Sequence, residues 1–231
     1  MGEQPITVHH VRAGARTHRI VQVPQRPGRL ALRDEQHWLT LYADRAGLAR
    51  LVAAWSLAAR SPHSLLHLPL RGHPLPDGPT PAPMYPGGHP ALDLVLAHHS
   101  LQFRPSAWKD LRSRLGPGRP QRAATPAADF PTGPRFADRF PHPDFRDHLH
   151  FALAAATLFV TASAPAFRDS GTALHTLLTQ APAAHHHDLA HPSPRHKCTD
   201  LTTAPARFPT PHTAAVPSLL HVQYCPDWTY A

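Results

Sequence analysis

Proline sets the strongest limit on how this chain can fold. Twenty-nine of the 231 residues are proline, far above the roughly 5% of ordinary proteins. Proline fixes φ and has no amide donor, so it interrupts helices and strand ladders alike. Sixteen of these prolines fall within residues 117–231. The distribution predicts regular structure in the first half of the chain and long irregular stretches in the second.

A strand and a helix are the clearest elements of the first half. In residues 38–43, Leu39, Leu41 and Ala43 alternate with other residues, as on one face of a strand. Asp44 follows at a helix N-cap position, where its carboxylate can accept from first-turn amides. An apolar stripe at helical spacing comes next, formed by Leu48, Leu51, Val52, Trp55 and Ala59. The pattern predicts a helix that ends at Ser61-Pro62.

Further strands surround this unit. β-Branched runs at residues 6–11 and 19–23 predict a hairpin, and alternating leucines predict strands at residues 64–70 and 92–96. Pro69 indicates a strand end or an edge position. A short second helix starts at Pro105, with Trp108, Leu111 and Leu115 on one side. Residues 1–116 are therefore predicted to form a small α+β domain, with a mostly antiparallel sheet and one or two helices on one face.

The remainder, residues 117–231, is predicted to be a low-complexity, largely disordered tail rich in Pro, Ala and His. Alanine is its commonest apolar residue and buries little area, so little offsets the entropy of ordering. Short helices are expected near residues 144–164 and 172–180. Residues 219–230 regain aromatic side chains and are expected to dock as a terminal strand.

Positive charge belongs to the first half of the chain. Residues 1–116 hold 14 Arg and Lys against 7 Asp and Glu, whereas residues 117–231 hold 9 against 8. The predicted second helix has basic residues on and around it, and such a cluster is typical of phosphate-facing surfaces as well as of solvated helix faces. One hypothesis is therefore a nucleic-acid-binding protein that uses Arg104, Lys109, Arg112 and Arg119.

A histidine-rich tract suggests a second alternative. Imidazole and thiolate groups bind zinc, nickel or copper, and the tract supplies His185, His186, His187, His191, His196 and Cys198. No second ligand pair stands at zinc-finger spacing, so compositional bias explains the tract equally well. A metal-binding tail remains a hypothesis, and no cofactor is assigned.

No enzyme motif is found in the sequence. There is no Gly-rich phosphate loop ending in Gly-Lys-Ser/Thr and no G-x-G-x-x-G after a strand. The histidine pairs lack an adjacent nucleophile or carboxylate pair. With no signal peptide or apolar span and only two cysteines, the expected location is the cytoplasm. These features favour a non-enzymatic protein-binding module, for which aromatic residues are the candidate contacts: Trp38, Tyr42 and Tyr85.

The stretch from residue 38 to residue 96 resembles small bacterial toxin-immunity proteins. The matching segments are Leu39-Thr40-Leu41-Tyr42-Ala43, Asp44-Arg45-Ala46-Gly47-Leu48, His67-Leu68 and Leu92-Asp93-Leu94-Val95-Leu96. In that family the unit is a compact α+β domain that binds and blocks a partner protein. The resemblance covers about a quarter of the chain and implies another protein as the partner, with no catalytic residues.

Overall fold

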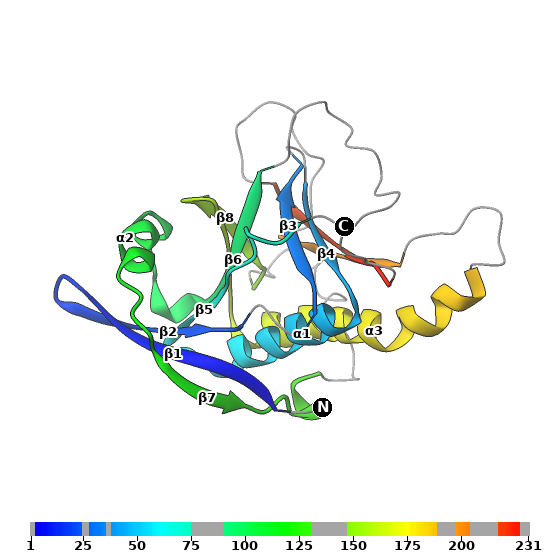
Figure 1. Ribbon diagram of the computed structural model, residues 1–231, viewed down its shortest axis with the longest axis horizontal. Helices are drawn as coiled ribbons and strands as arrows, with labels where there is room; N and C mark the ends of the chain where they lie inside the picture. Colours follow the sequence, from blue (N-terminus) through cyan, green and yellow to red (C-terminus); the bar gives the residue numbers. More distant parts are fainter. Residues whose placement is uncertain are drawn as a thin grey trace.

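In the residues that it describes, the computed structural model shows an α+β fold with eleven strands in one mixed sheet and three α-helices (Figure 1). The α+β class predicted from the sequence is therefore confirmed. The structure describes residues 3–24, 28–35, 38–74, 90–130, 147–188, 197–203 and 217–226.

The first two strands form the predicted hairpin. β1 (Gln4–Ala13) and β2 (Arg16–Gln22) pair antiparallel from Thr7↔Gln22 to Ala13↔Arg16. Gly14 occupies the first of the two turn positions with a φ of 59°. Glycine adopts this conformation without the steric penalty that a Cβ would bring. The sequence thus fixes the reversal of the chain at this point.

The predicted strand and capped helix are also present. β3 (Leu30–Asp34) pairs antiparallel with β4 (Leu39–Ala43), which leads into α1 (Arg45–Arg60). The Asp44 carboxylate accepts from the Gly47 amide at 2.6 Å and from the Arg29 amide at 3.0 Å, so it caps α1 and holds the preceding loop. The apolar stripe predicted for α1 is buried, and its members are Leu48, Leu51, Val52, Trp55 and Ala59.

Two central strands connect the halves of the sheet. β5 (Ser64–Leu68) and β6 (Ala91–His98) pair antiparallel, and β5 has β2 on its other side. Of the two positions that Pro69 indicated, the strand end is confirmed, because this proline directly follows β5. The edge position is wrong, because β5 has a neighbour on each side. β6 has three neighbours: β3 at its start, β5 further along, and β9 on its opposite edge.

The sheet runs in the order β10-β11-β4-β3-β6-β5-β2-β1-β7, with β9 and β8 attached to β6. β7 (Arg119–Ala123) is an edge strand on β1. β10 (Cys198–Thr202) pairs antiparallel with β11 (Leu219–Tyr224), and β11 lies parallel to β4. An isolated bridge joins Leu149 to Thr203, so the strands from β10 round to β8 nearly close on themselves.

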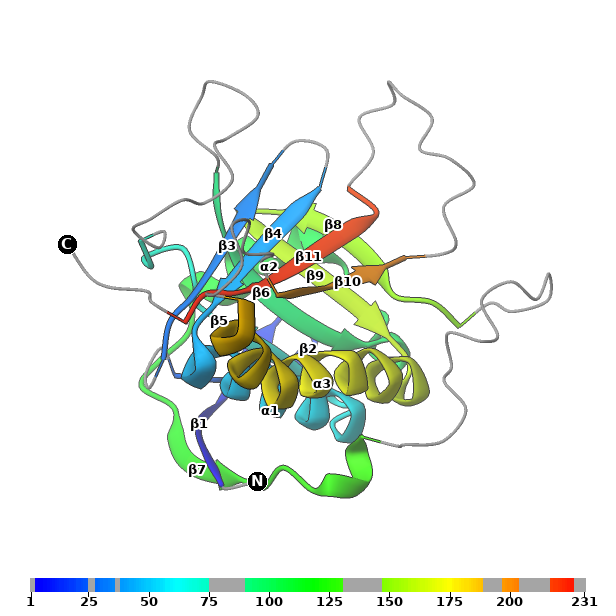
Figure 2. The ribbon, with the colours of Figure 1, turned by 90° about the vertical axis from the view of Figure 1, so that its right-hand side faces the viewer.

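Helices cover both faces of the sheet. α1 and α3 (Ala164–Asp188) lie side by side across one face (Figures 1 and 2). The opposite face is covered by a segment that contains η1 (His99–Leu101), η2 (Pro105–Ala107) and α2 (Trp108–Ser113). Helices on one face only were predicted; the second apolar face, around Val95 and Phe159, needs its own cover. None of the helices in the described ranges is long and apolar enough to cross a membrane.

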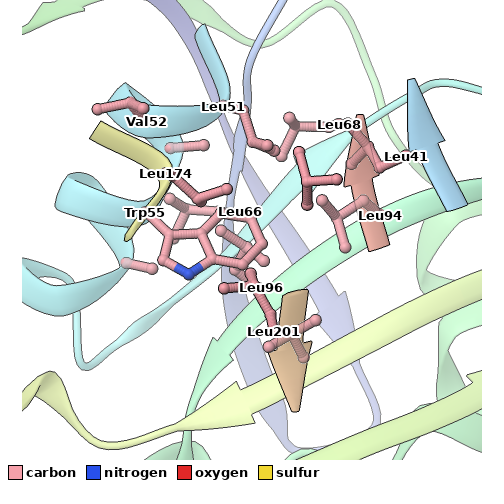
Figure 3. Close-up of a cluster of buried hydrophobic side chains, with 14 of the residues drawn as sticks. Leu41, Leu51, Val52, Trp55, Leu66, Leu68, Leu94, Leu96, Leu174 and Leu201 are labelled. Carbon is pink, nitrogen blue, oxygen red and sulfur yellow. The ribbon is translucent and has the colours of Figure 1, made fainter. Parts of the chain in front are cut away.

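The main core lies between the sheet and the two long helices. Figure 3 shows Trp55 from α1 against Leu66 and Leu96 of the sheet and Leu174 of α3. The Trp55 indole is fully buried, and its Nε1 donates to Ser170 Oγ at 3.1 Å. Trp55 therefore connects α1, which the sequence predicted, to α3, which comes from the region predicted to be largely disordered.

The expectation of a long irregular tail after residue 116 is wrong for the described residues. Strands β7, β8, β9, β10 and β11 and helix α3 all come from this region and belong to the same sheet and core. The region has few large apolar residues, but they are concentrated in short segments in which nearly every one is buried. Examples are Leu158, Val160, Leu174, Leu201 and Val222.

The expectation of a helix near residues 144–164 is also wrong. The structure has a hairpin there, made of β8 (His150–Ala154) and β9 (Thr157–Ala162). Its turn residues, Ala155 and Ala156, both have positive φ, at 50° and 53°. Hairpin turns of this kind normally contain Asn or Gly, so no local residue pattern marks a reversal here.

Two other expectations for this region are confirmed. The helix near residues 172–180 is confirmed as part of the longer α3, and the terminal strand is confirmed as β11. A short helical turn, η3 (Ala127–Asp129), packs against α3. The segments 131–146, 189–196 and 204–216 lie outside the described residues.

Candidate nucleic-acid interface

Helix α2 is held on the second face of the sheet by buried side chains. Trp108 and Leu111 are fully buried, and Trp108 Nε1 donates to Thr157 Oγ1 at 3.1 Å. The Trp108 ring meets Phe159 and His67 edge to face, with centroids 6.0 and 5.0 Å apart. These contacts fix the helix, so that Lys109 and Arg114 are turned outward and exposed.

A buried carboxylate fixes the same helix electrostatically. Asp93 of β6 is 3% exposed. Its Oδ2 accepts from Arg71 Nε at 2.9 Å and from Arg112 Nη1 at 3.1 Å, while its Oδ1 accepts from the Leu70 and Arg71 amides. His67 Nε2 lies 3.8 Å from the same Oδ2. Asp93 therefore joins β6, the chain after β5, and α2 in one contact.

The charge state of Asp93 follows from these partners. Burial by itself would raise the pKa of the carboxyl. The adjacent His67 ring, the Arg71 amide and the positive charge of Arg71 outweigh this effect and lower the pKa to about 2. Asp93 is therefore ionised at neutral pH, and all of its acceptor positions face donors. This arrangement is a structural ion cluster rather than a reactive acid.

Exposed basic side chains gather around α2. The basic rim, as we define it, comprises seven exposed residues of the β1–β2 hairpin, the α2 segment and β7: Arg12, Arg16, Arg104, Lys109, Arg114, Arg119 and Arg122. The three elements touch, because β1 pairs with β7 and Arg114 Nη1 donates to the Arg12 carbonyl at 3.3 Å. Figure 1 shows the tip of the hairpin and α2 at the left of the molecule and β7 along its bottom, beside β1.

Few acids offset this charge. Residues 3–24 and 99–123 contain nine Arg and Lys but only Glu3 and Asp110 as acids, an excess of seven, whereas the whole chain has a net charge of +8. Asp110 pairs with Arg114 at 2.7 Å, and Glu3 lies 3.7 Å from Arg122. Most of the chain's net positive charge therefore belongs to the β1–β2 hairpin, the α2 segment and β7.

The structure separates the four residues of the nucleic-acid hypothesis. Arg104, Lys109 and Arg119 are exposed. Arg112 is only partly exposed, and its guanidinium turns inward and donates to Asp93 and to the Ala155 carbonyl. Sequence reasoning missed Arg12 and Arg16, whose approach to α2 depends on contacts between distant segments. The only available signal was the first-half charge excess.

The residues of the protein-binding hypothesis lie in different environments. Trp38 is partly exposed where the chain enters β4. Tyr42 is 5% exposed and packs with Ala31 and Cys225, and its hydroxyl donates to Glu35 at 3.3 Å. Burial and the Glu35 charge both raise its pKa. Tyr42 is thus a core residue with little surface to offer a partner, and Tyr85 lies outside the described residues.

The proposed metal ligands are mostly beyond the described part of the chain. His185, His186 and His187 fall in the last turns of α3, where only the backbone is described, and His191 and His196 lie outside it. Cys198 lies on β10 and is an exposed residue. Partial burial of its thiol and the nearby charge of Asp200 both raise its pKa. Among the described residues, no three His, Cys, Asp or Glu side chains gather as metal ligands.

No protein-family model, curated protein or solved structure matches this chain. The functional argument therefore depends on the geometry and charge of the site itself.

Proposed function

We propose that this protein binds nucleic acid through the basic rim. The observation that supports the proposal most is the contact between three separate elements, each bearing exposed arginine or lysine, which together hold most of the net charge. Phosphate contacts from such residues supply most of the affinity of sequence-independent binding.

The rim differs from an ordinary solvated face in its rigidity. α2 is fixed by two fully buried side chains and by the Asp93 ion cluster, and β7 is paired along β1. A fixed array of charges loses less conformational freedom on binding than one on a mobile segment. Two of the seven rim residues form ion pairs, Arg114 with Asp110 and Arg122 with Glu3. The other five are available for phosphate contacts: Arg12, Arg16, Arg104, Lys109 and Arg119.

The salt dependence of binding tests this proposal. Fluorescence anisotropy with a labelled 20-base-pair duplex would be measured across a series of NaCl concentrations. With four or five phosphate contacts, the slope of log K against log salt should be about −4, so affinity should fall by roughly 10²–10³ between 50 and 200 mM salt. The variants Lys109→Ala and Arg119→Ala should each reduce the slope by about 1.

Arg45→Ala is the matched control. Arg45 is an exposed arginine at the start of α1, in the layer on the other face of the sheet from α2. Its removal lowers the net charge by the same amount but should leave the slope unchanged. Absence of binding at 25 mM salt would refute the proposal, as would equal effects of the rim variants and the control.

A further inference from the structure

The outer part of the β1–β2 hairpin projects beyond the rest of the fold. Its base is buried, with Val8, Ile20 and Val21 in the cores. Beyond residue 11, by contrast, Arg12 and the four residues from Gly14 to Thr17 are all exposed. Figure 1 shows this tip extending past the ends of α1 and α3. A two-stranded ribbon therefore leaves the body of the molecule.

The projecting ribbon carries positive charge and no acid. Residues 10–19 contain Arg12, Arg16 and Arg19 and no Asp or Glu. Arg12 pairs across the strands with Thr17, and exposed His10 pairs with Arg19, so one face of the ribbon is a row of polar side chains. Arg16 pairs with Ala13 and lies on the other face, so both faces of the tip carry an exposed arginine. Arginine, histidine and threonine side chains all donate hydrogen bonds. The ribbon thus presents donors to an electron-rich partner.

The ribbon is also stiff. Continuous pairing from Thr7↔Gln22 to Ala13↔Arg16 fixes the two strands, and the two-residue turn at Gly14 leaves no slack. Arg12 Nε donates to the Gly14 carbonyl at 3.4 Å, and Arg114 of the α2 segment donates to the Arg12 carbonyl. The segment that supplies Lys109 to the basic rim therefore also supports the ribbon.

The dimensions of the ribbon select one form of nucleic acid. Paired strands lie about 4.8 Å apart, and the tip beyond residue 11 has two strand residues on each side, Arg12 and Ala13 opposite Arg16 and Thr17, so it extends about 7 Å at roughly 3.4 Å per residue. The major groove of B-DNA is about 12 Å wide and 8.5 Å deep and admits a two-stranded ribbon. The minor groove, about 6 Å wide, does not, and the major groove of A-form RNA is too narrow for side-chain readout.

We infer that the tip of the β1–β2 ribbon enters the major groove of duplex DNA, with Arg12 on one face of the tip and Arg16 on the other, both at base edges. Lys109 and Arg119 then lie at the flanking phosphates. The inference rests on the proposed nucleic-acid function and names its substrate. Arginine in the major groove donates to O6 and N7 of guanine. The ribbon therefore prefers sites that contain guanine, while the rest of the rim is indifferent to sequence.

Methylation protection with dimethyl sulfate tests the inference, because guanine N7 lies in the major groove and adenine N3 in the minor groove. With the full chain bound to a mixed-sequence duplex, N7 should be protected and N3 should remain reactive. Affinity for the duplex should exceed that for the matching single strand, and for double-stranded RNA of the same sequence, by at least tenfold.

Two variants separate the ribbon from the rim. Arg16→Ala should abolish most of the N7 protection and the preference for duplex DNA, whereas Lys109→Ala should weaken all nucleic acids alike. Both positions are exposed, so neither change threatens folding. Protection of N3 instead of N7, or equal affinity for RNA and DNA, would overturn the ribbon inference alone. Absence of binding to every nucleic acid would remove the proposed function as well.

Discussion

Replacement of Asp93 by Asn removes the charge that joins α2 to the sheet. The amide retains one oxygen for the Leu70 and Arg71 amides, but its NH₂ group would face the donors of Arg71 and Arg112. Breaking one side of a buried ion pair costs about 3–5 kcal/mol. Arg71 and Arg112 are 42% and 22% exposed and regain some hydration, so we expect a loss of about 3 kcal/mol, at the lower end of that range.

Urea unfolding followed by tryptophan fluorescence measures this loss. With an m-value of about 3 kcal/mol/M, the midpoint at pH 7 should fall by about 1 M. Asp110→Asn is the control: its exposed pair with Arg114 should be worth less than about 1 kcal/mol.

The pH dependence of the same variant gives a second measurement. Because folding lowers the pKa of Asp93 from its ordinary value near 3.9 to about 2, the stabilisation by its charge is complete above about pH 4 and is lost as the pH falls towards 2. The difference between the wild type and Asp93→Asn should shrink over that interval. An unchanged midpoint at pH 7, or a difference that persists undiminished at pH 2, would contradict the structural role of the cluster.

Two further substitutions test the region after residue 116. Ala156→Gly should raise stability by up to about 1 kcal/mol, because relief of roughly 1–2 kcal/mol of left-handed backbone strain exceeds the entropy cost of glycine. Thermal unfolding measures this gain. The control is Ala49→Gly at an exposed position of α1, which should lower stability. Asp129→Asn should lower stability by about 2 kcal/mol, because its carboxylate accepts from Ser56 at 2.5 Å and from Arg60 at 2.7 Å. Urea unfolding checks the second change, and a variant as stable as the wild type would show that η3 is not held against α1.

The first half of the fold was predictable because its patterns are local. The stripe of α1, its Asp44 cap and the alternation in β4 each lie within a few residues, and each is formed as expected. The β8–β9 hairpin was not predictable in this way. Alanine at both turn positions imitates a continuous helix, and only the parallel pairing of β9 with β6 explains the strand.

The candidate site was predictable only in its charge. The exposure of Lys109 and Arg119 agrees with their sequence context, but the inward turn of Arg112 depends on Asp93, nineteen positions away on another strand. The contributions of Arg12 and Arg16 depend on the pairing of β1 with β7, which no local pattern specifies. Long-range pairing therefore decides which basic residues form a surface and which form the interior.

The position of β11 has a consequence for the synthesis of the protein. Leu39 of β4 pairs with Leu220 of β11, 181 positions later in the chain. During translation β4 leaves the ribosome long before β11 exists, so one of its edges has no strand partner in the interval. Unpaired edges of this kind favour association with other chains, and pairing between such distant segments is intrinsically slow. The sheet therefore reaches its full width only after the last described strand has been made.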